Sequence, residues 1–93
     1  MITIKPTYEN NSINGAWLIN DKATIYVPFS LCIVIADCIT FYDNDIIGSQ
    51  AWAGYIEIYF DYDGSILLSD GDETVIIMKN EIKDVSKQLW DMI

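Results

Sequence analysis

Carboxylates, tyrosines and two cysteines are the side chains of this sequence that could do chemistry. From Asp61 to Ser65, two carboxylates and a hydroxyl surround Gly64, a set of oxygen atoms suited to calcium. A calcium-binding loop of the EF-hand type has glycine at position six, acids at positions three and five, and glutamate at position twelve. Counted from Asp61, the glycine here is fourth, and the flanking residues alternate as in strands. The segment therefore predicts a hairpin turn.

The groups that catalysis needs are few. The chain contains no histidine, so neither a Ser-His nor a Cys-His pair can form. Two separated cysteines do not make a zinc site, and no glycine-rich phosphate loop occurs. Paired carboxylates can hydrolyse glycosides, but a chain of 93 residues has no obvious groove for a sugar. We expect no catalytic residue, no metal and no cofactor, and hence not an enzyme.

The six-residue spacing of the two cysteines, Cys32 and Cys38, keeps their side chains too far apart to form a disulfide on either a helix or a strand. Their spacing turns them roughly 240° apart on a helix, or places them roughly 20 Å apart on a strand. We expect free thiols in a reducing cytosol.

The first residues lack the charged start and apolar run of a signal peptide. The most apolar stretch, residues 25–41, is interrupted by Pro28 and Asp37 and is too short to span a bilayer. These features predict a cytoplasmic protein.

An alternation of apolar and polar residues predicts a three-stranded meander at the start of the chain. Its β-rich segments are separated by turns that contain Asn and Asp, as hairpins often are. Pro6 has no N–H group for a sheet ladder, so the first strand is expected to lie at a sheet edge. The expected strands are residues 2–8, 13–19 and 23–27.

Residues 29–42 are ambiguous between a helix and a strand. Their polar residues Ser30, Asp37 and Thr40, together with Asn44 just beyond the segment, fall on one narrow helical stripe, and Pro28 precedes the segment. Many of the other residues are β-branched or aromatic, which favours a strand. Fourteen residues is long for a strand and typical of a helix. We therefore expect a nearly buried central helix.

The clearest β pattern follows a loop at residues 43–50. Alternation from Tyr55 to Tyr62 is strict, and Asp63-Gly64 is a favoured pair for a two-residue type I′ turn. A second two-residue turn is expected at residues 71–72. The expected strands of this second meander are residues 55–62, 65–70 and 73–78.

The last segment has the apolar periodicity of a helix. Apolar side chains recur at spacings of four, three, four and four, and the residues are Met78, Ile82, Val85, Leu89 and Ile93. Asn80 is a suitable N-cap, and Glu81 then lies near the positive end of the helix dipole. The sequence therefore predicts a helix at residues 80–93, with Lys79, Lys83 and Lys87 on a neighbouring face.

These elements define an α+β fold. We expect a small single acidic globular domain, residues 1–93, in which antiparallel β meanders pack against a C-terminal helix and a central apolar helix. A chain of this length buries about 60–65% of its unfolded surface, enough for one core. Trp17, Trp52 and Trp90 are expected in that core. Trp90 lies beside the lysine face and is expected to be partly exposed.

The two-residue turns would align acidic residues across the second meander. Tyr62 would pair with Ser65, Glu57 would lie opposite Asp70, and Asp70 would lie opposite Glu73 on one face of the sheet. Ile66 and Leu68 would share that face. Because directly opposed like charges destabilise a sheet, this arrangement favours a role in binding. The alternative is a solvated turn in which a bulge or a longer loop staggers the charges.

Tyrosines beside carboxylates suit a docking surface. Tyrosine supplies contact area at interfaces, and carboxylates pair with Arg or Lys of a partner. The candidate partner-binding residues are Tyr55, Glu57, Tyr59, Asp61, Asp63, Asp70, Asp72 and Glu73.

The overall charge limits the class of partner. Fourteen acids oppose five lysines, arginine is absent, and the net charge is −9. Nucleic acids and anionic membranes are bound mainly through Lys and Arg, so we expect neither as a direct partner. An acidic surface attracts a basic protein and accelerates the encounter. The alternative is that the charge serves solubility alone.

At the level of protein class, the chain resembles small acidic inhibitors from bacteria and phages. The resemblance rests on size, acidity, missing catalytic residues and the tyrosine–carboxylate face. It implies an immunity protein, or antitoxin, that covers the basic cleft of a nuclease-type toxin. One alternative is a phage-encoded inhibitor of a host defence nuclease, of anti-CRISPR or anti-restriction type, some of which mimic DNA. Another is a structural or oligomeric domain without inhibitory role.

Overall fold

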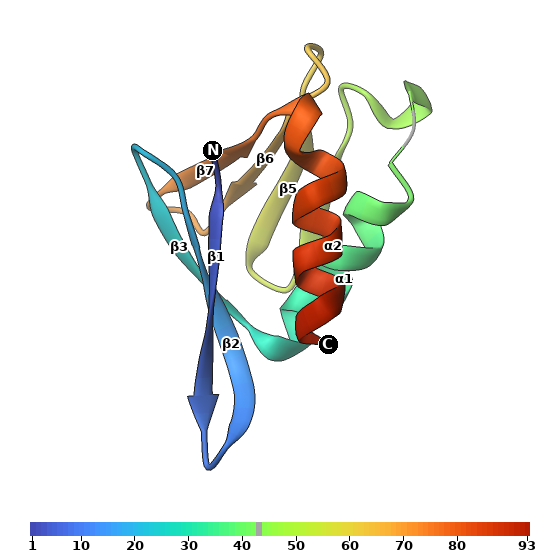
Figure 1. The fold of residues 1–93 in the computed structure, drawn as a ribbon. Coiled ribbons are helices and arrows are strands. Elements are labelled where there is room, and N and C mark those ends of the chain that lie inside the picture. Colours follow the sequence, from blue (N-terminus) through green and yellow to red (C-terminus); the bar gives the residue numbers. More distant parts are fainter. Residues whose placement is uncertain (43) are drawn as a thin grey trace.

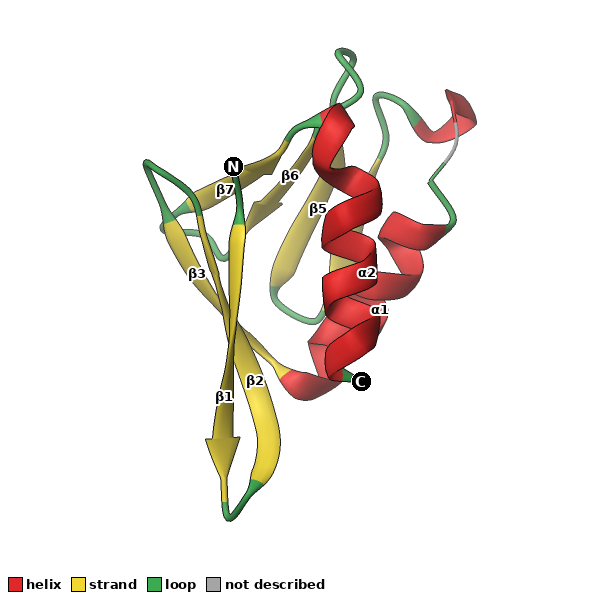
Figure 2. Cartoon of the chain, in the orientation of Figure 1, coloured by secondary structure: helices red, strands yellow, loops and turns green. Residues whose placement is uncertain are grey.

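A pair of helices packs against two antiparallel sheets that meet through β3 and β7 (Figures 1 and 2). The computed structural model describes residues 1–42 and 44–93. The expected α+β architecture is confirmed. The strands are β1 (Thr3–Glu9), β2 (Ser12–Ile19), β3 (Thr24–Pro28), β4 (Gln50–Ala53), β5 (Ile56–Phe60), β6 (Ile66–Ser69) and β7 (Thr74–Ile77). The helices are α1 (Phe29–Thr40) and α2 (Ile82–Met92), with short 3₁₀ helices η1 (Asn44–Ile46) and η2 (Lys79–Glu81).

The first sheet is the meander expected at the start of the chain, in the order β1-β2-β3. Asn10 and Asn11 form its first turn, both with positive φ, at 51° and 66°. Positive φ at both central residues defines the type I′ turn, whose twist matches that of the flanking strands. Pro6 lies on β1, at the edge of this sheet, as its missing N–H group requires.

The second sheet, in the order β4-β5-β6-β7, contains one strand that was not expected. The loop expected at residues 43–50 ends where β4 begins, and Asp43 lies outside the described residues. Gly54 and Tyr55 join β4 to β5, with Ala53 paired to Ile56 and Gly54 at a φ of 59°. A glycine with positive φ at the first central position suits a type II′ hairpin turn. The helix α1 packs on this turn, because a Cβ on Gly54 would come within 2.9 Å of the Leu31 side chain.

The central segment is a helix, as expected. α1 follows Pro28 directly, and Ser30, Asp37 and Thr40 are exposed along it. The opposite side buries Cys32, Ile35, Ala36 and Ile39. Periodicity therefore outweighs the strand preference of the β-branched residues here, because helical spacing separates the few polar side chains from the core.

The last helix starts later than expected. Asn80 lies within η2 and is exposed, so the expectation that it caps the helix is wrong. Glu81 organises this end of the helix instead. Its Oε1 accepts the N–H of Met78 at 3.3 Å, and its Oε2 accepts the N–H of Ile2 at 2.8 Å. One carboxylate thus satisfies two backbone donors and fastens the start of β1 to the helical layer.

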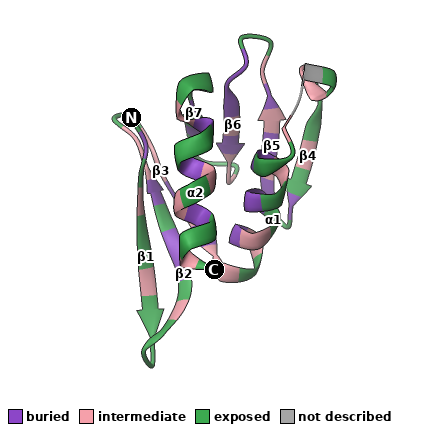
Figure 3. Cartoon of the chain, turned by 45° about the vertical axis from the view of Figure 1, so that its right-hand side comes forward, coloured by how far each residue is buried: buried purple, intermediate pink, exposed green. Residues whose placement is uncertain are grey.

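A single core joins the sheets and the helices. α1 contacts β2, β3 and β4, whereas α2 contacts α1 and β1. Buried residues alternate with half-buried or exposed ones along β5, β6 and β7, and they recur at helical spacing along α2 (Figure 3). The largest fully buried side chains are aliphatic and include Leu18, Ile25, Ile35, Ile39, Ile56, Ile58, Ile66, Leu68, Ile77 and Leu89. No helix in the described part of the chain has the length and hydropathy needed to cross a membrane.

Both cysteines lie on α1 and neither forms a disulfide. Burial raises the pKa of the Cys32 thiol to about 11. Burial, and then the neighbouring Asp37 carboxylate, raise the pKa of Cys38. Because the thiolate is the nucleophilic form, a raised pKa makes both thiols less reactive than an exposed cysteine.

Candidate protein-binding surface

The pairing of β5 with β6 differs by one residue from the expected register. Glu57 pairs with Ser69 rather than Asp70, and the loop holds three residues, 62–64, rather than two. Asp61, not Tyr62, closes the loop, because its N–H donates to the Ser65 carbonyl at 3.0 Å. Gly64 has a φ of 90°, which suits the last position of a three-residue hairpin loop.

A one-residue slip moves every side chain of a strand to the opposite face. Ile66 and Leu68 are therefore fully buried beneath the sheet instead of lying beside Glu57 and Tyr59. The acidic row across three strands does not form, so that expectation is wrong. The expected pairing of Asp70 with Glu73 is confirmed, since the Asp70 N–H donates to the Glu73 carbonyl at 3.2 Å.

One face of the second sheet lies on the side away from the buried core, and we call it the outer face. The cross-strand pairs define two rows on it, Gln50–Tyr59–Leu67–Ile76 and Trp52–Glu57–Ser69–Thr74. Trp52 is 57% exposed and Ile76 is 42% exposed. Tyr59, Leu67 and Glu57 are half-buried. Aromatic and aliphatic side chains thus form the middle of an open sheet face, with a single carboxylate among them.

The predicted acidic residues lie mainly at the two ends of this outer face. β6 begins after Ser65 and ends before Asp70, so the loops on either side of it lie at opposite ends of the sheet. Asp61 and Asp63 belong to one loop, whereas Asp70, Asp72 and Glu73 belong to the other. Of the predicted acidic residues, only Glu57 lies within the face, where it accepts a hydrogen bond from Gln50 Nε2 at 2.6 Å.

Two of these acids hold their own loops. Asp70 Oδ1 accepts the N–H groups of Asp72 and Glu73, both at 2.9 Å. Asp63 Oδ1 accepts the N–H of Ser65 at 2.9 Å and the Ser65 hydroxyl at 2.6 Å. These hydrogen bonds to the charged form lower the pKa of both carboxyl groups. Asp63 and Asp70 therefore shape the turns in which they lie.

The lowered pKa of Asp70 predicts a loss of stability in acid. Its folded-state pKa lies below the ordinary value of 3.8, so its contribution is full above pH 3.8 and is lost as the pH falls through the folded-state pKa. We expect Asp70→Asn, which keeps an acceptor oxygen but has no charge to titrate, to flatten the fall in unfolding free energy below that pH. Urea denaturation across this range measures the slope. Asp72→Asn is the matched control, and an equal flattening by both variants would contradict this role of Asp70.

The predicted tyrosines take different positions. Tyr59 lies in the middle of the outer face, and partial desolvation, followed by the charges of Tyr62 and Asp61, raises its pKa. Tyr55 is exposed in the β4–β5 turn, where its hydroxyl donates to the Tyr26 carbonyl of β3 at 3.3 Å. Tyr59 is therefore available for contact on the face itself, whereas Tyr55 links the edge of this surface to the first sheet.

Two of the three tryptophans are more exposed than expected. Trp17 is 42% exposed and Trp52 57%, so their expected place in the core is wrong, whereas the expected partial exposure of Trp90, at 39%, is confirmed. Trp17 stacks edge-on against Tyr26 with ring centroids 5.0 Å apart. Trp90 donates from Nε1 to Thr40 Oγ1 at 2.6 Å. Among the three, Trp52 is the most exposed, and it was missed as a binding residue because its strand was not foreseen.

This arrangement has the composition of a protein interface. Interfaces combine an aromatic and apolar centre with a polar rim, and charged residues are depleted at the centre. Trp52, Tyr59 and Ile76 supply such a centre, and the two acidic loops supply such a rim. In residues 1–42 and 44–93, no cluster of His, Cys, Asp or Glu is arranged to hold a metal ion.

Comparison with protein-family models, with curated proteins and with solved structures found no match to this chain.

Proposed function

We propose that this protein is an inhibitor that binds a basic protein through the outer face and its acidic loops. The observation that carries the proposal is the open sheet face, with exposed Trp52 in an aromatic and aliphatic centre and acids at both ends. Helices cover one side of the sheet, so the other side is free to meet a partner. Binding by this face needs no reaction, so it fits a chain without histidine.

The partner class follows from charge. A nuclease must attract a polyanion, so the cleft that holds its substrate is lined by Lys and Arg. A chain of net charge −9 is attracted to such a cleft and excludes the nucleic acid once seated there. We therefore propose a toxin with nuclease activity as the partner, an immunity protein as the class, and the cytoplasm as the place of action.

The direct test uses the protein encoded by the reading frame beside this gene. Its nuclease activity is measured alone and with increasing amounts of this chain. The proposal predicts stoichiometric loss of activity and protection of cells that express both proteins. A neighbouring product that is a nuclease but retains full activity at excess inhibitor would contradict it. If the neighbours encode other functions against host defence, blockage of a host defence nuclease instead would favour the phage-inhibitor alternative.

Charge reversal on the acidic rim is expected to slow association. Asp72 and Glu73 are exposed and enter the turn through their backbone groups, while their carboxylates form no hydrogen bond within residues 1–42 and 44–93, so Asp72→Lys with Glu73→Lys leaves the loop intact. Steered association weakens with salt, since charges are screened within about 8–10 Å at 0.1–0.15 M. We expect the double reversal to lower the association rate about tenfold at low salt and less at high salt. Stopped-flow mixing with the partner measures this rate.

The matched control is a double charge reversal on α2, Asp84→Lys with Asp91→Lys. It makes the same change in net charge at positions away from the outer face. A local role of the rim predicts a smaller effect from this pair. Equal slowing by both double variants would show that only the net charge matters and would remove the rim from the interface.

A further inference from the structure

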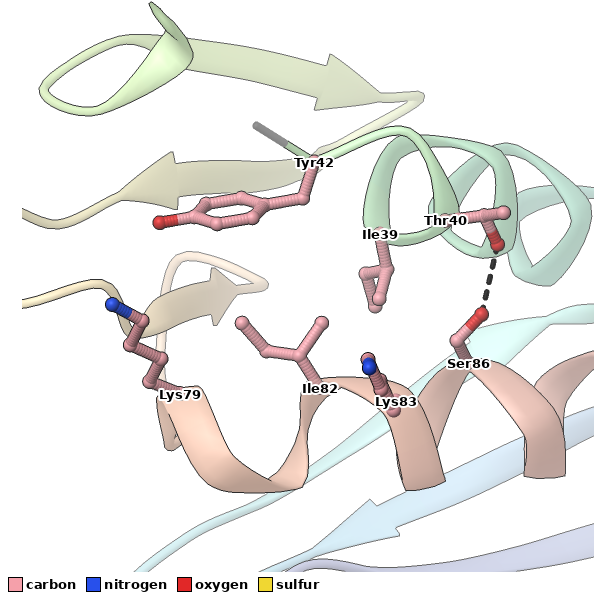
Figure 4. Close-up of a pocket in the computed structure, with 7 residues that line it drawn as sticks. All are labelled: Ile39, Thr40, Tyr42, Lys79, Ile82, Lys83 and Ser86. Carbon is pink, nitrogen blue, oxygen red and sulfur yellow. Dashed lines mark hydrogen bonds between the residues drawn. The ribbon is translucent and has the colours of Figure 1, made fainter. Parts of the chain in front are cut away.

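A cavity opens between the end of α1 and the start of the last helix, on a part of the surface separate from the outer face. Its volume is about 410 Å³. Ile39 of α1 and Ile82 of α2 line it, and the ring of Tyr42 lies across from Ile82 (Figure 4). Tyr42 is held in this position by a tilted contact with the Phe60 ring, at a centroid distance of 5.9 Å. The cavity is therefore apolar in its interior.

Of the hydroxyl groups at the cavity, those of Thr40 and Ser86 have hydrogen-bond partners and that of Tyr42 has none among the described residues. Thr40 and Ser86 are joined by a hydrogen bond of 2.8 Å between their hydroxyl oxygens, and Trp90 Nε1 donates to Thr40 Oγ1. The Tyr42 hydroxyl is buried and has no hydrogen-bond partner among the described residues. Because buried polar groups are nearly always hydrogen-bonded, this hydroxyl is a donor in need of an acceptor.

Two lysines lie at the cavity. Lys79 and Lys83 both line it, and in residues 1–42 and 44–93 neither forms an ion pair. Figure 4 places the Lys79 ammonium and the Tyr42 hydroxyl at the same end of the cavity. Lys87, one helical turn further on, is different, since its ammonium is paired with Asp91 at 2.9 Å.

The acids nearest to these lysines along the chain are engaged elsewhere. Glu81 accepts the backbone N–H groups of Ile2 and Met78, and Asp84 accepts a hydrogen bond from Gln88 at 2.8 Å. The methylene groups of Lys79 pack against Gly64, where a Cβ would approach to 2.7 Å, so the β5–β6 loop holds the stem of this lysine. Two of the five lysines of the chain therefore lie at one apolar cavity without an ion-pair partner among the described residues.

We propose that this cavity binds a small amphipathic organic acid. Its carboxylate accepts hydrogen bonds from the ammonium of Lys79 and from the Tyr42 hydroxyl, with Lys83 adding positive charge at the cavity. Its hydrocarbon part packs between Ile39, Ile82 and the ring of Tyr42. Lysine recognises an anion as a point charge, and the hydroxyl adds direction, so an acid is preferred to an alcohol of the same length.

The test compares three probes that share a six-carbon chain: hexanoate, 1-hexanol and hexylammonium. Each is titrated into ¹⁵N-labelled protein while the backbone amide shifts are followed. We expect saturable shifts with hexanoate at residues 39–42 and 79–86, and binding about tenfold weaker for 1-hexanol, as loss of a charge-assisted hydrogen bond implies. Hexylammonium is expected to leave these amides unshifted.

Variants locate the anion contact. Lys79→Gln combined with Lys83→Gln is expected to weaken hexanoate about tenfold and to leave 1-hexanol unchanged. Tyr42→Phe removes only the hydroxyl, keeps the ring against Phe60, and is expected to weaken hexanoate several-fold. Lys87→Gln is the matched control and should bind hexanoate as the parent does. Thermal melts confirm that each variant is folded.

Three results would overturn the proposal. Equal affinity for hexanoate and 1-hexanol would reduce the cavity to an apolar groove without anion recognition. Absence of saturable shifts with hexanoate at residues 39–42 and 79–86 would leave no site. An equal loss of hexanoate affinity in Lys87→Gln would mean that general charge, and not these two lysines, attracts the acid.

Discussion

Replacing Leu89 by alanine is expected to lower the free energy of unfolding by about 2–5 kcal/mol, the usual loss for a buried leucine. Leu89 is 1% exposed on α2 and belongs to the core that joins this helix to the sheets. The truncation removes apolar contact and leaves a cavity, because neighbouring side chains relax only in part. Urea denaturation monitored by circular dichroism measures the change.

Met78→Ala is the matched control for Leu89→Ala. Both residues belong to the same apolar stripe of the sequence, but Met78 is 50% exposed and precedes the helix. Its truncation is expected to change the free energy of unfolding by no more than about 0.5 kcal/mol, as at most surface positions. Similar losses for the two variants, or a loss below about 0.5 kcal/mol for Leu89→Ala, would contradict the burial of this stripe.

The sequence predicts the helices because their polar residues are few and regularly spaced. On α1 only Ser30, Asp37 and Thr40 need solvent, and the helical stripe is the arrangement that exposes all of them together. On α2 the stripe correctly marks Val85 and Leu89 as core. The start of this helix differs from the prediction, because Glu81 organises it through a contact with Ile2, just before β1, that spacing along the chain does not reveal.

The hairpins are predictable as pairs of strands but not in their register. Asp63-Gly64 fits both a two-residue loop and the end of a three-residue loop, since glycine adopts positive φ in each. The structure takes the longer loop, which buries Ile66 and Leu68 and leaves Glu57 on the outer face. Burial of apolar side chains therefore decides the register, and it overrides the turn preference.

The outer face could be predicted only in part. Glu57 and Tyr59 were identified from the alternation of β5, but Trp52 was not, because β4 is only four residues long and has small alanines on its inward side. Its signal was the alternation of Gln50 and Trp52 with Ala51 and Ala53, followed by Gly54. Composition alone favours burial of a tryptophan, so its exposure had to come from the three-dimensional arrangement.

Two aromatic residues define the expected centre of the interface. Trp52 pairs with Glu57, and Tyr59 pairs with Gln50, so the two aromatic residues are diagonal neighbours on adjacent strands. Side chains in diagonal positions are about 7–8 Å apart, within reach of each other for large rings. Binding energy at interfaces concentrates in tryptophan and tyrosine near the centre, where a rim of other residues excludes water. A partner that covers Trp52 therefore also covers Tyr59.

Trp52→Ala is expected to raise the dissociation rate of the complex by roughly 30-fold, equivalent to the loss of about 2 kcal/mol at a hot spot. Tyr59→Ala is expected to have an effect of the same order, and the two together less than the product, because they share one contact region. Tyr8→Ala removes an exposed aromatic residue from β1, outside the outer face, and should leave the rate unchanged. Surface plasmon resonance with the immobilised partner measures the dissociation rates.

Since Trp52 is exposed in the free protein, its truncation should leave the melting temperature nearly unchanged, which separates a binding role from a structural one. Parent-like dissociation in both Trp52→Ala and Tyr59→Ala would move the interface away from the outer face.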